Sequence, residues 1–498
     1  MDRIIVLDDL NDHVLRCVFE RLALRQRVTN ELVCRRWMHL MPYNDVRSFE
    51  IGQLSWPLRH VNELTYSINN LTYTQRVMAN KRFIRYMQFL LCRFGPHLRR
   101  LKLADSPEFR VQFTSELARQ LVEMAPNLQQ LHLGGAVVHV QAVQVLRRLP
   151  RLQALNLSSA HFLDEHTAQP PSNYSELSRT LSQLVSGGGA QDSTAFAPGA
   201  SLLETLNLRQ CPVVPRVPPA GTSLRALTLD NVPSVTNDIL AELCRNCPLL
   251  RSLSLSDCRQ LTSFAPVAML RQLEALSVNG TKITNDDLQL LCSQCARIVR
   301  LRIDNCTLLS AFGCLRALHN LSVLWLGPAA TFGDGELARI SRHGRLTDVV
   351  LSSTAVSDNG VRYLAAHCPA LTQLHASGTQ ITDEGVACVL SDCGGLRSLN
   401  VQSTNVTNAS LGAIGRLSRA LHLCFVQNCR QIDELGFTAL HRERTRRLHQ
   451  GQCLARLLLV AGGEYAQPIS DTIVQQLVQV AVLVEVKRPV LALTFTPH

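Results

Sequence analysis

No hydrophobic run in the sequence is long enough to cross a membrane. The longest apolar stretches, such as residues 477–486, are interrupted by Gln479 and Glu485 and fall well short of the roughly 20 residues that a spanning helix requires. The first residues carry acids among apolar side chains and lack a basic leader, so we expect no secretory signal. We therefore expect a soluble protein of the cytoplasm, the nucleus or both, whose 17 cysteines stay reduced.

Local signals of catalysis and of cofactor binding are missing as well. No glycine-rich phosphate loop, HExxH or GxSxG motif occurs, and no series of cysteines and histidines fits a RING domain. Two CxxC pairs, at residues 244–247 and 292–295, could imitate a zinc site, but they occupy matching positions two units apart in the repeat described below. We expect a non-catalytic protein without cofactor or metal.

Charged residues make up only 18% of the chain, whereas hydrophobic residues make up 46%. With 498 residues and a mean hydropathy near zero, the chain can bury a large core, which excludes disorder along most of its length. The net charge of +11 favours an acidic partner surface. Nucleic acid is the weakest partner hypothesis, because the basic stretch that begins at Lys81 has few aromatic residues apart from Phe83, Tyr86 and Phe89.

A leucine pattern, LxxLxL, recurs along most of the chain. Its starts lie at Leu98, Leu128, Leu152, Leu203, Leu224, Leu250, Leu273, Ile298, Leu321, Leu346, Leu371, Leu396, Leu421 and Leu454. From Leu321 to Leu421 the starts are 25 residues apart, and from Leu224 to Leu321 the spacing is 23 to 26 residues. The first, fourth and sixth positions predict a short strand with one buried face, and a later apolar group packs a helix over it, so that only stacked units bury both elements.

Most of these units also carry a cysteine or threonine three positions after the last strand leucine. These residues are Cys211, Cys258, Cys306 and Cys429 in some units and Thr281, Thr354, Thr379 and Thr404 in others. We expect a buried ladder, since backbone groups that leave the sheet need hydrogen-bond partners there. The pattern resembles the cysteine-containing class of leucine-rich repeats over about four fifths of the chain, which implies an α/β solenoid shaped like a horseshoe.

The period breaks between Leu152 and Leu224. The first part contains prolines, a glycine run and a Ser/Ala-rich stretch, so we expect a mobile insertion near residues 161–200 with one short helix over residues 175–185. The unit that begins at Leu203 contains four prolines that forbid an ordinary outer helix, and it should cross the outer face as an extended segment.

Residues 6–45 differ in kind from the repeats. Leu10, Val14, Val18 and Leu22 recur every four positions, as on one face of a helix, and a second apolar stripe ends at Trp37. About 40 residues cannot bury enough surface to be stable alone, so the module must dock on the repeats or on another protein. Val33-Cys-Arg-Arg-Trp37, together with Leu10-Asn11 and Leu22-Ala-Leu24-Arg25, resembles the F-box, although Asn11 and Ala23 stand where that family usually has proline.

The F-box resemblance implies a partner and a function. In that family the module binds the S-phase kinase-associated adaptor of a cullin-RING ubiquitin ligase, and the repeats hold the protein substrate. By this resemblance the chain is the substrate receptor of an SCF-type ubiquitin ligase. Candidates for the adaptor interface or its supporting core are Leu10, Val14, Leu15, Val18, Phe19, Leu22, Leu24 and Trp37. The alternative is a non-ligase interaction scaffold or inhibitor, in which the N-terminal helices merely cap the solenoid.

Substrate contacts are predicted from strand geometry, because the second, third and fifth positions of LxxLxL face the concave side. The candidates are Arg99, Arg100, Lys102, Arg300, Arg302, Trp325, His375 and Phe425. Trp325 and Phe425 stand out, since aromatic residues and arginines dominate protein interfaces, although both rings could instead pack on each other or on the C-terminal tail. The predicted order is an F-box-like module (6–45), a helical linker (46–97) and a solenoid with a C-terminal cap (98–498).

Overall fold

The computed structural model describes parts of the chain that together cover most of the repeats. These are residues 15, 18–22, 26, 81–103, 110–165, 167, 169–171, 174–186, 202–217, 222–452, 454–462 and 470–487, with the backbone of residues 48–50, 62–68 and 71–78. The chain divides into two compact units, residues 1–250 and residues 251–498. Among the described residues, no helix is both long enough and apolar enough to span a membrane.

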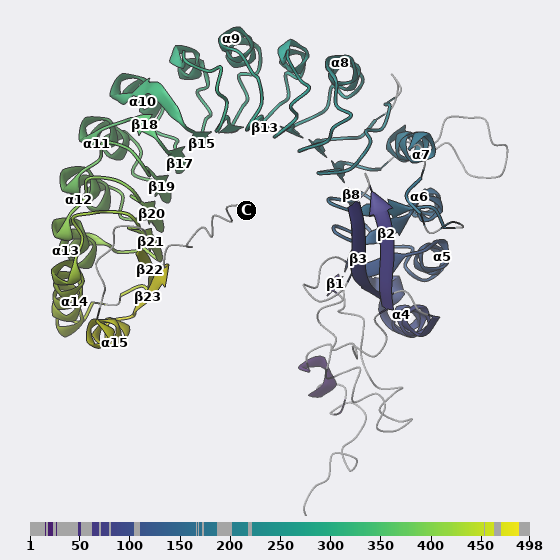
Figure 1. The fold of residues 1–498 in the computed structure, drawn as a ribbon, viewed down its shortest axis with the longest axis horizontal. Helices are drawn as coiled ribbons and strands as arrows, with labels where there is room; N and C mark the ends of the chain where they lie inside the picture. Colours follow the sequence, from purple (N-terminus) through teal and green to yellow (C-terminus); the bar gives the residue numbers. More distant parts are fainter. Residues whose placement is uncertain are drawn as a thin grey trace, which may run out of the picture. The chain divides into compact units, whose positions relative to one another are not determined.

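The first unit has a parallel sheet whose strands follow the leucine pattern. Leu98, Leu101 and Leu103 are fully buried, whereas Arg100 and Lys102 between them are exposed, so each short strand has one face in the core. In sheet order the strands are β1 (Ser48–Glu50), β4 (Arg100–Lys102), β6 (Gln130–His132), β8 (Ala154–Asn156), β10 (Thr205–Asn207) and β11 (Ala226–Thr228). The helices are α4 (Lys81–Phe94), η4 (Gly95–His97), α5 (Ser115–Met124), α6 (Val140–Leu146), α7 (Ser175–Ser186) and α8 (Asn237–Asn246). The α-helices cover the outer side of this sheet (Figure 1).

A second, smaller sheet in the first unit corrects the predicted helical linker over residues 46–97. Its strands are β2 (Asn62–Ile68), β3 (Leu71–Met78), β5 (Arg110–Phe113), β7 (Val137–His139) and β9 (His161–Leu163). Strands β2 and β3 form an antiparallel hairpin, and β1 pairs with β4, so in this range α4 and the short η4 alone are helical among the described residues. The prediction was wrong because β1 and β3 also pair with strands distant in sequence, β4 and β5, and because the local hairpin of β2 and β3 was overlooked.

The expected mobile insertion near residues 161–200 is also corrected in part. The predicted short helix is present as α7, and it buries Leu177, Leu181 and Val185 beside α6 like any other outer helix of the stack. Residues 187–200 lie outside the described residues. The next segment, residues 211–217, is extended as the prolines predict, and the Ser178 hydroxyl of α7 donates a hydrogen bond to its Val214 carbonyl oxygen at 2.9 Å.

The second unit repeats one strand and one helical segment with even spacing. In sheet order its strands are β12 (Ser252–Ser254), β13 (Ala275–Ser277), β14 (Arg300–Arg302), β15 (Val323–Leu326), β17 (Asp348–Leu351), β19 (Gln373–His375), β20 (Ser398–Asn400), β21 (Leu423–Phe425), β22 (Leu457–Gly462) and β23 (Val482–Lys487). They pair in parallel and in register, for example Leu374 with Leu399, and the equivalent residue of each repeat therefore falls in one row across the sheet. A two-stranded sheet of β16 (Ala329–Gly333) and β18 (Thr354–Ala355) is added beside α10.

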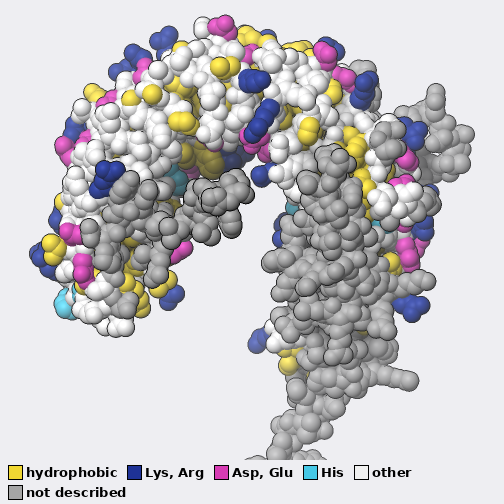
Figure 2. Space-filling model, in the orientation of Figure 1, with side chains coloured by type: hydrophobic (Ala, Val, Ile, Leu, Met, Phe, Trp, Pro, Cys, Tyr) yellow, Lys and Arg dark blue, Asp and Glu magenta, His cyan; other side chains and the backbone are white. Residues whose placement is uncertain are grey.

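Helical segments cover the outer side of this sheet (Figure 1). They are η5 (Ala265–Met269), α9 (Asn285–Gln294), η6 (Gly313–Ala317), α10 (Asp334–Ser341), α11 (Asp358–His367), α12 (Asp383–Asp392), α13 (Asn408–Leu417), α14 (Glu434–His449) and α15 (Asp471–Gln479). Basic and acidic side chains are interspersed along this helical rim (Figure 2). The outer side of the second unit thus has the mixed charge of a solvated surface. Residues 488–498, which the predicted C-terminal cap includes, lie outside the described residues.

The predicted ladder of cysteines and threonines is confirmed. All eight residues are buried, from Cys211 to Cys429. The Thr404 hydroxyl donates to the Val401 carbonyl oxygen at 2.6 Å, and the Cys429 thiol of the next repeat donates to the same oxygen at 3.2 Å. The ladder therefore satisfies carbonyl groups that leave the sheet within the apolar core.

A second ladder joins the helix starts of neighbouring repeats, and it was not predicted. The Asp358 carboxylate at the start of α11 accepts hydrogen bonds from the Thr382 amide at 2.8 Å, from the Thr382 hydroxyl and from the Gly385 amide. Asp383 does the same for Thr407 and Ser410 of the following repeat. The amide groups at a helix start have no partner within the helix, so Asp358 and Asp383 each add a cap to the helix of the next repeat, beside that helix's own threonine cap.

Candidate functional site

The exposed side of the second unit's sheet is the candidate functional site. Because side chains alternate along a strand, the middle residue of each strand enters the core. Its two neighbours lie on the other side of the sheet, away from the helical segments (Figure 1). We call this site the strand-face surface and define it by Arg300, Arg302, Trp325, Val350, His375, Phe425, Leu458 and Leu483. Register places Arg302, Trp325, Val350, His375, Asn400 and Phe425 in one row across six strands.

An arginine and a tryptophan form the basic end of this row. The guanidinium carbon of Arg302 lies 3.7 Å from the centre of the Trp325 ring, which is a cation–π contact. Just beyond β14, burial raises the pKa of the Asp304 carboxyl, and the charge of Arg302 offsets part of that rise. Arg302 thus packs on the ring of Trp325, and Trp325 itself is half-buried.

His375 occupies the middle of the row. Its Nε2 lies 3.3 Å from the Ser398 hydroxyl on the next strand. Burial lowers the pKa of His375 below its ordinary value of 6.5, and the charge of Asp348 on the strand before opposes this shift. The Asp348 carboxylate itself accepts hydrogen bonds from the Thr347 hydroxyl at 2.6 Å and the Thr372 hydroxyl at 3.1 Å. The imidazole is therefore neutral near pH 7 and can donate or accept one hydrogen bond.

Aliphatic side chains form the other end of the strand-face surface. Leu423, Leu458 and Leu483 pair in register across β21, β22 and β23, and Leu458 and Leu483 are 36% and 57% exposed. Phe425 lies on the same strand as Leu423 and is half-buried. An exposed apolar area of this kind, on the last three strands of the sheet, is typical of a protein-binding surface.

The predicted substrate residues separate into two groups. Arg300, Arg302, Trp325, His375 and Phe425 all reach the strand-face surface, and of these Arg302 and Trp325 are in contact. The two aromatic rings do not pack on each other, which was one of the alternatives left open: Trp325 packs on Arg302 and lies four strands away from Phe425. Arg99, Arg100 and Lys102 are exposed as predicted, but they lie at β4 of the first unit.

Four contributors to the site were not among the predicted residues. Asp348 and Leu423 stand at the third position of LxxLxL, so the pattern already contained the signal for them. Leu483 was missed because β23 is rich in valine and does not match the pattern. Asn400, at the fifth position, completes the row between His375 and Phe425.

The structure describes four of the candidate adaptor residues. Leu15 and Phe19 are 0% and 1% exposed, Val18 is 37% exposed, and Leu22 follows the end of the same short helix. Leu15 and Phe19 are therefore buried, whereas Val18 is open to solvent. Leu10, Val14, Leu24 and Trp37 lie outside the described residues.

The two CxxC pairs lie inside the helical layers. Cys244, Cys247, Cys292 and Cys295 are all buried, and burial raises the pKa of Cys247 and of Cys295 to about 11. Protonated, separately buried thiols of this kind are core residues. Among the described residues every cysteine is a free thiol, and no group of three or more His, Cys, Asp or Glu side chains could hold a metal ion.

The geometry defines a leucine-rich-repeat solenoid, and comparison with known proteins agrees for one repeat. Residues 367–390 match the family model described as leucine-rich repeat. A chain of the yeast Rad7–Elc1 complex is similar at 16% identity and a TM-score of 0.45, over 77% of this chain and 80% of that one. An internalin of Listeria monocytogenes is similar at 16% identity and a TM-score of 0.34, over 86% of this chain and 92% of that one. No curated protein matches the sequence.

Proposed function

We propose that the protein is the non-catalytic substrate receptor of an SCF-type ubiquitin ligase. The strand-face surface binds the protein substrate, and the N-terminal module binds the S-phase kinase-associated adaptor, which connects it to the cullin. The observation that carries the binding role is the row from Arg302 and Trp325 to Phe425, which presents the residue types that dominate protein interfaces. The adaptor role is supported by the F-box resemblance of residues 6–45.

The first test concerns the adaptor. We expect the purified full chain to bind recombinant adaptor in isothermal calorimetry, and Val18→Asp to abolish that binding, because a charge cannot be buried unpaired at an interface. Val18 is exposed, so this change leaves the core of the module intact. Leu249→Asp is the matched control, since Leu249 is an exposed leucine of the same unit, 48% accessible.

The scaffold alternative predicts a different result for the same experiment. In that case the intact chain does not bind the adaptor, and deletion of residues 1–45 lowers stability but leaves partner binding unchanged. Failure of the intact chain to bind would therefore favour the scaffold and remove the ligase role.

The second test concerns the strand-face surface. Proteins that are labelled by proximity to the full chain, and that accumulate when cullin activation is inhibited, form the substrate set. We expect Trp325→Ala to reduce their labelling by at least tenfold, because a hot-spot aromatic contributes about 2 kcal/mol or more. Tyr363→Ala is the matched control, since this ring on α11 is 54% exposed on the helical side. Equal loss in both variants would show that the strand face is not the binding surface.

A further inference from the structure

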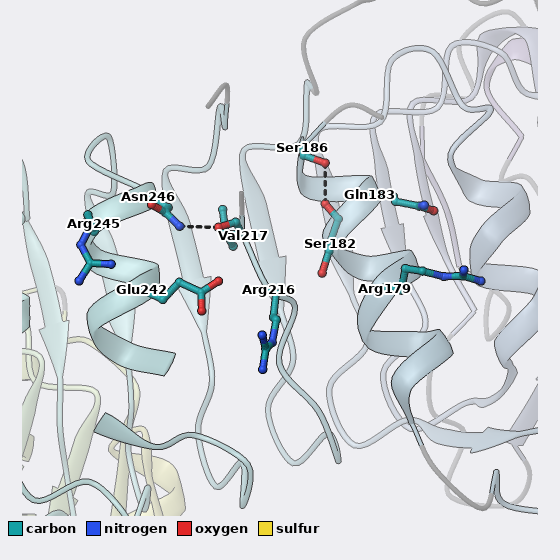
Figure 3. Close-up of a pocket in the computed structure, with 9 residues that line it drawn as sticks. All are labelled: Arg179, Ser182, Gln183, Ser186, Arg216, Val217, Glu242, Arg245 and Asn246. Atoms are coloured by element: carbon teal, nitrogen blue, oxygen red, sulfur yellow. Dashed lines mark hydrogen bonds between the residues drawn. The ribbon is translucent and has the colours of Figure 1, made fainter. Parts of the chain in front are cut away.

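The outer side of the first unit has a gap in its layer of helices. Residues 211–217 are extended where neighbouring repeats have a helix. The space between α7 and α8 is therefore not filled by a helix. Hydrogen bonds fix the segment on both sides. The Ser178 hydroxyl of α7 donates to the Val214 carbonyl oxygen, and the side-chain amide of Asn246 on α8 donates to the Val217 carbonyl oxygen at 2.5 Å. Figure 3 shows this segment between the two helices.

The gap is a groove with a volume of about 490 Å³. Figure 3 shows Arg179 and Ser182 on α7, Arg216 on the extended segment, and Glu242 and Arg245 on α8. A smaller cavity of about 180 Å³ adjoins it and shares Arg216 and Glu242. The two together lie within the ~300–1,000 Å³ that is usual for ligand-sized sites.

The groove is basic, and its cations are unpaired. Arg179, Arg216 and Arg245 are exposed, and none of them forms an ion pair within the described part of the chain. Glu242 is the single acidic residue of the lining. By contrast, Arg225 in the same unit lies 3.7 Å from Glu204. Three free guanidinium groups around one groove favour carboxylates, which they can hold through paired hydrogen bonds.

The smaller cavity adds apolar walls and an unsatisfied polar atom. Val213, Val214 and Pro215 of the extended segment and Ile239 of α8 line it. The Ser234 hydroxyl oxygen, also in the lining, is buried without a hydrogen-bond partner. An unpaired buried hydroxyl costs free energy unless a bound group supplies its partner. The site therefore offers apolar contact and a hydrogen bond beside the cationic rim.

We propose that this groove binds a short acidic, amphipathic segment of a partner protein. Carboxylates of the segment pair with Arg179, Arg216 and Arg245, and one apolar side chain enters the cavity between Val213 and Ile239. The segment takes the space that an outer helix fills in neighbouring repeats. This surface is distinct from the strand-face surface and does not depend on the ligase role.

The test uses the full chain and a short fluorescein-labelled peptide of alternating glutamate and leucine. We expect Arg179→Glu, Arg216→Glu and Arg245→Glu combined to weaken binding in fluorescence anisotropy by at least about tenfold. The matched control is Arg342→Glu, Arg345→Glu and Arg416→Glu combined, which changes the net charge equally at exposed arginines of the second unit, and it should weaken binding less than about twofold. Circular dichroism checks that both triple variants keep their fold.

Two further arms separate a protein partner from any polyanion. A peptide with serine in place of leucine should bind at least about fivefold more weakly, because the apolar walls are then unused. A single-stranded oligonucleotide of equal charge should compete poorly for the same reason. The proposal is overturned if the full chain does not bind the peptide, if both triple variants weaken binding equally, or if the serine peptide or the oligonucleotide binds as well as the leucine peptide.

Discussion

Removal of the Asp383 carboxylate should uncap a helix in the neighbouring repeat. This side chain accepts hydrogen bonds from the Thr407 amide at 2.8 Å, the Thr407 hydroxyl at 2.6 Å, the Ser410 amide at 3.0 Å and the Ser410 hydroxyl. Asp383→Ala leaves both amides at the start of α13 without this partner. The affected helix is thus not the one that carries the mutation.

The magnitude follows from these contacts. Hydrogen bonds to a charged group contribute about 1.5–3 kcal/mol each when buried, but Asp383 is only half-buried, and water replaces part of what is lost. We therefore expect the free energy of unfolding to fall by about 2–3 kcal/mol. Burial alone would raise the pKa of the Asp383 carboxyl, but the bonds from Ser410 and Thr407 outweigh it and hold the pKa below its ordinary value of 3.8. The stabilisation is hence present above about pH 4 and is lost as the pH falls through the lowered pKa.

Urea unfolding and amide hydrogen exchange measure the effect. Exchange should accelerate most at the first turn of α13, and the stability difference from the native chain should shrink at acidic pH. Asp392→Ala is the control, because Asp392 is exposed at the other end of α12 and should change stability by about 0.5 kcal/mol or less. Faster exchange confined to α12, or a loss no larger than that of the control, would refute the account of capping between repeats.

Three further predictions concern other residues of the second unit. Gly385→Ala should cost about 1–3 kcal/mol in urea unfolding, because an added Cβ would collide with the Asp358 carboxylate that caps this helix, whereas Gly395→Ala meets open space and should not. Arg444→Leu should cost about 2–4 kcal/mol and speed exchange in β22 and β23, since this buried guanidinium donates to the Val480 and Ala455 carbonyl oxygens at 2.9 and 2.7 Å; an unchanged β22 would contradict this. Burial holds the His375 imidazole neutral in the folded state, so the native chain should lose stability as the pH falls below about 6.5. His375→Gln should remove this loss in urea unfolding; if the loss persists in the variant, another group causes it.

The repeats could be read from the sequence because their structural rules are local. A leucine at the first, fourth and sixth positions fixes which face of a strand is buried, and Leu98, Leu101 and Leu103 behave as predicted. The proline-rich stretch over residues 211–217 was likewise predictable, since proline is excluded from the interior of an α-helix whatever the surrounding fold. Strand β1 was not, because its partner β4 lies about 50 residues further along the chain. Strands β2 and β3 pair locally as a hairpin, and their alternating pattern was overlooked.

The candidate site was predictable by position but not by contact. Strand alternation placed Trp325 and Phe425 on the exposed side, yet the packing of Arg302 on Trp325 required the register of two strands 23 residues apart. The basic groove on the outer side had no signal of its own, because its arginines come from three segments that the fold brings together. The prolines predicted only that this repeat has no outer helix, and this absence leaves the space for the groove.

The capping of each helix by the repeat before it gives this part of the chain a direction. Asp334, Asp358 and Asp383 all serve the repeat that follows, so loss of a repeat from the N-terminal side removes hydrogen bonds that the remaining helices need. Loss from the C-terminal side only returns an aspartate to water. Such a stack should therefore lose order more readily from its leading end, and a chain emerging from the ribosome meets each new helix with its cap already in place.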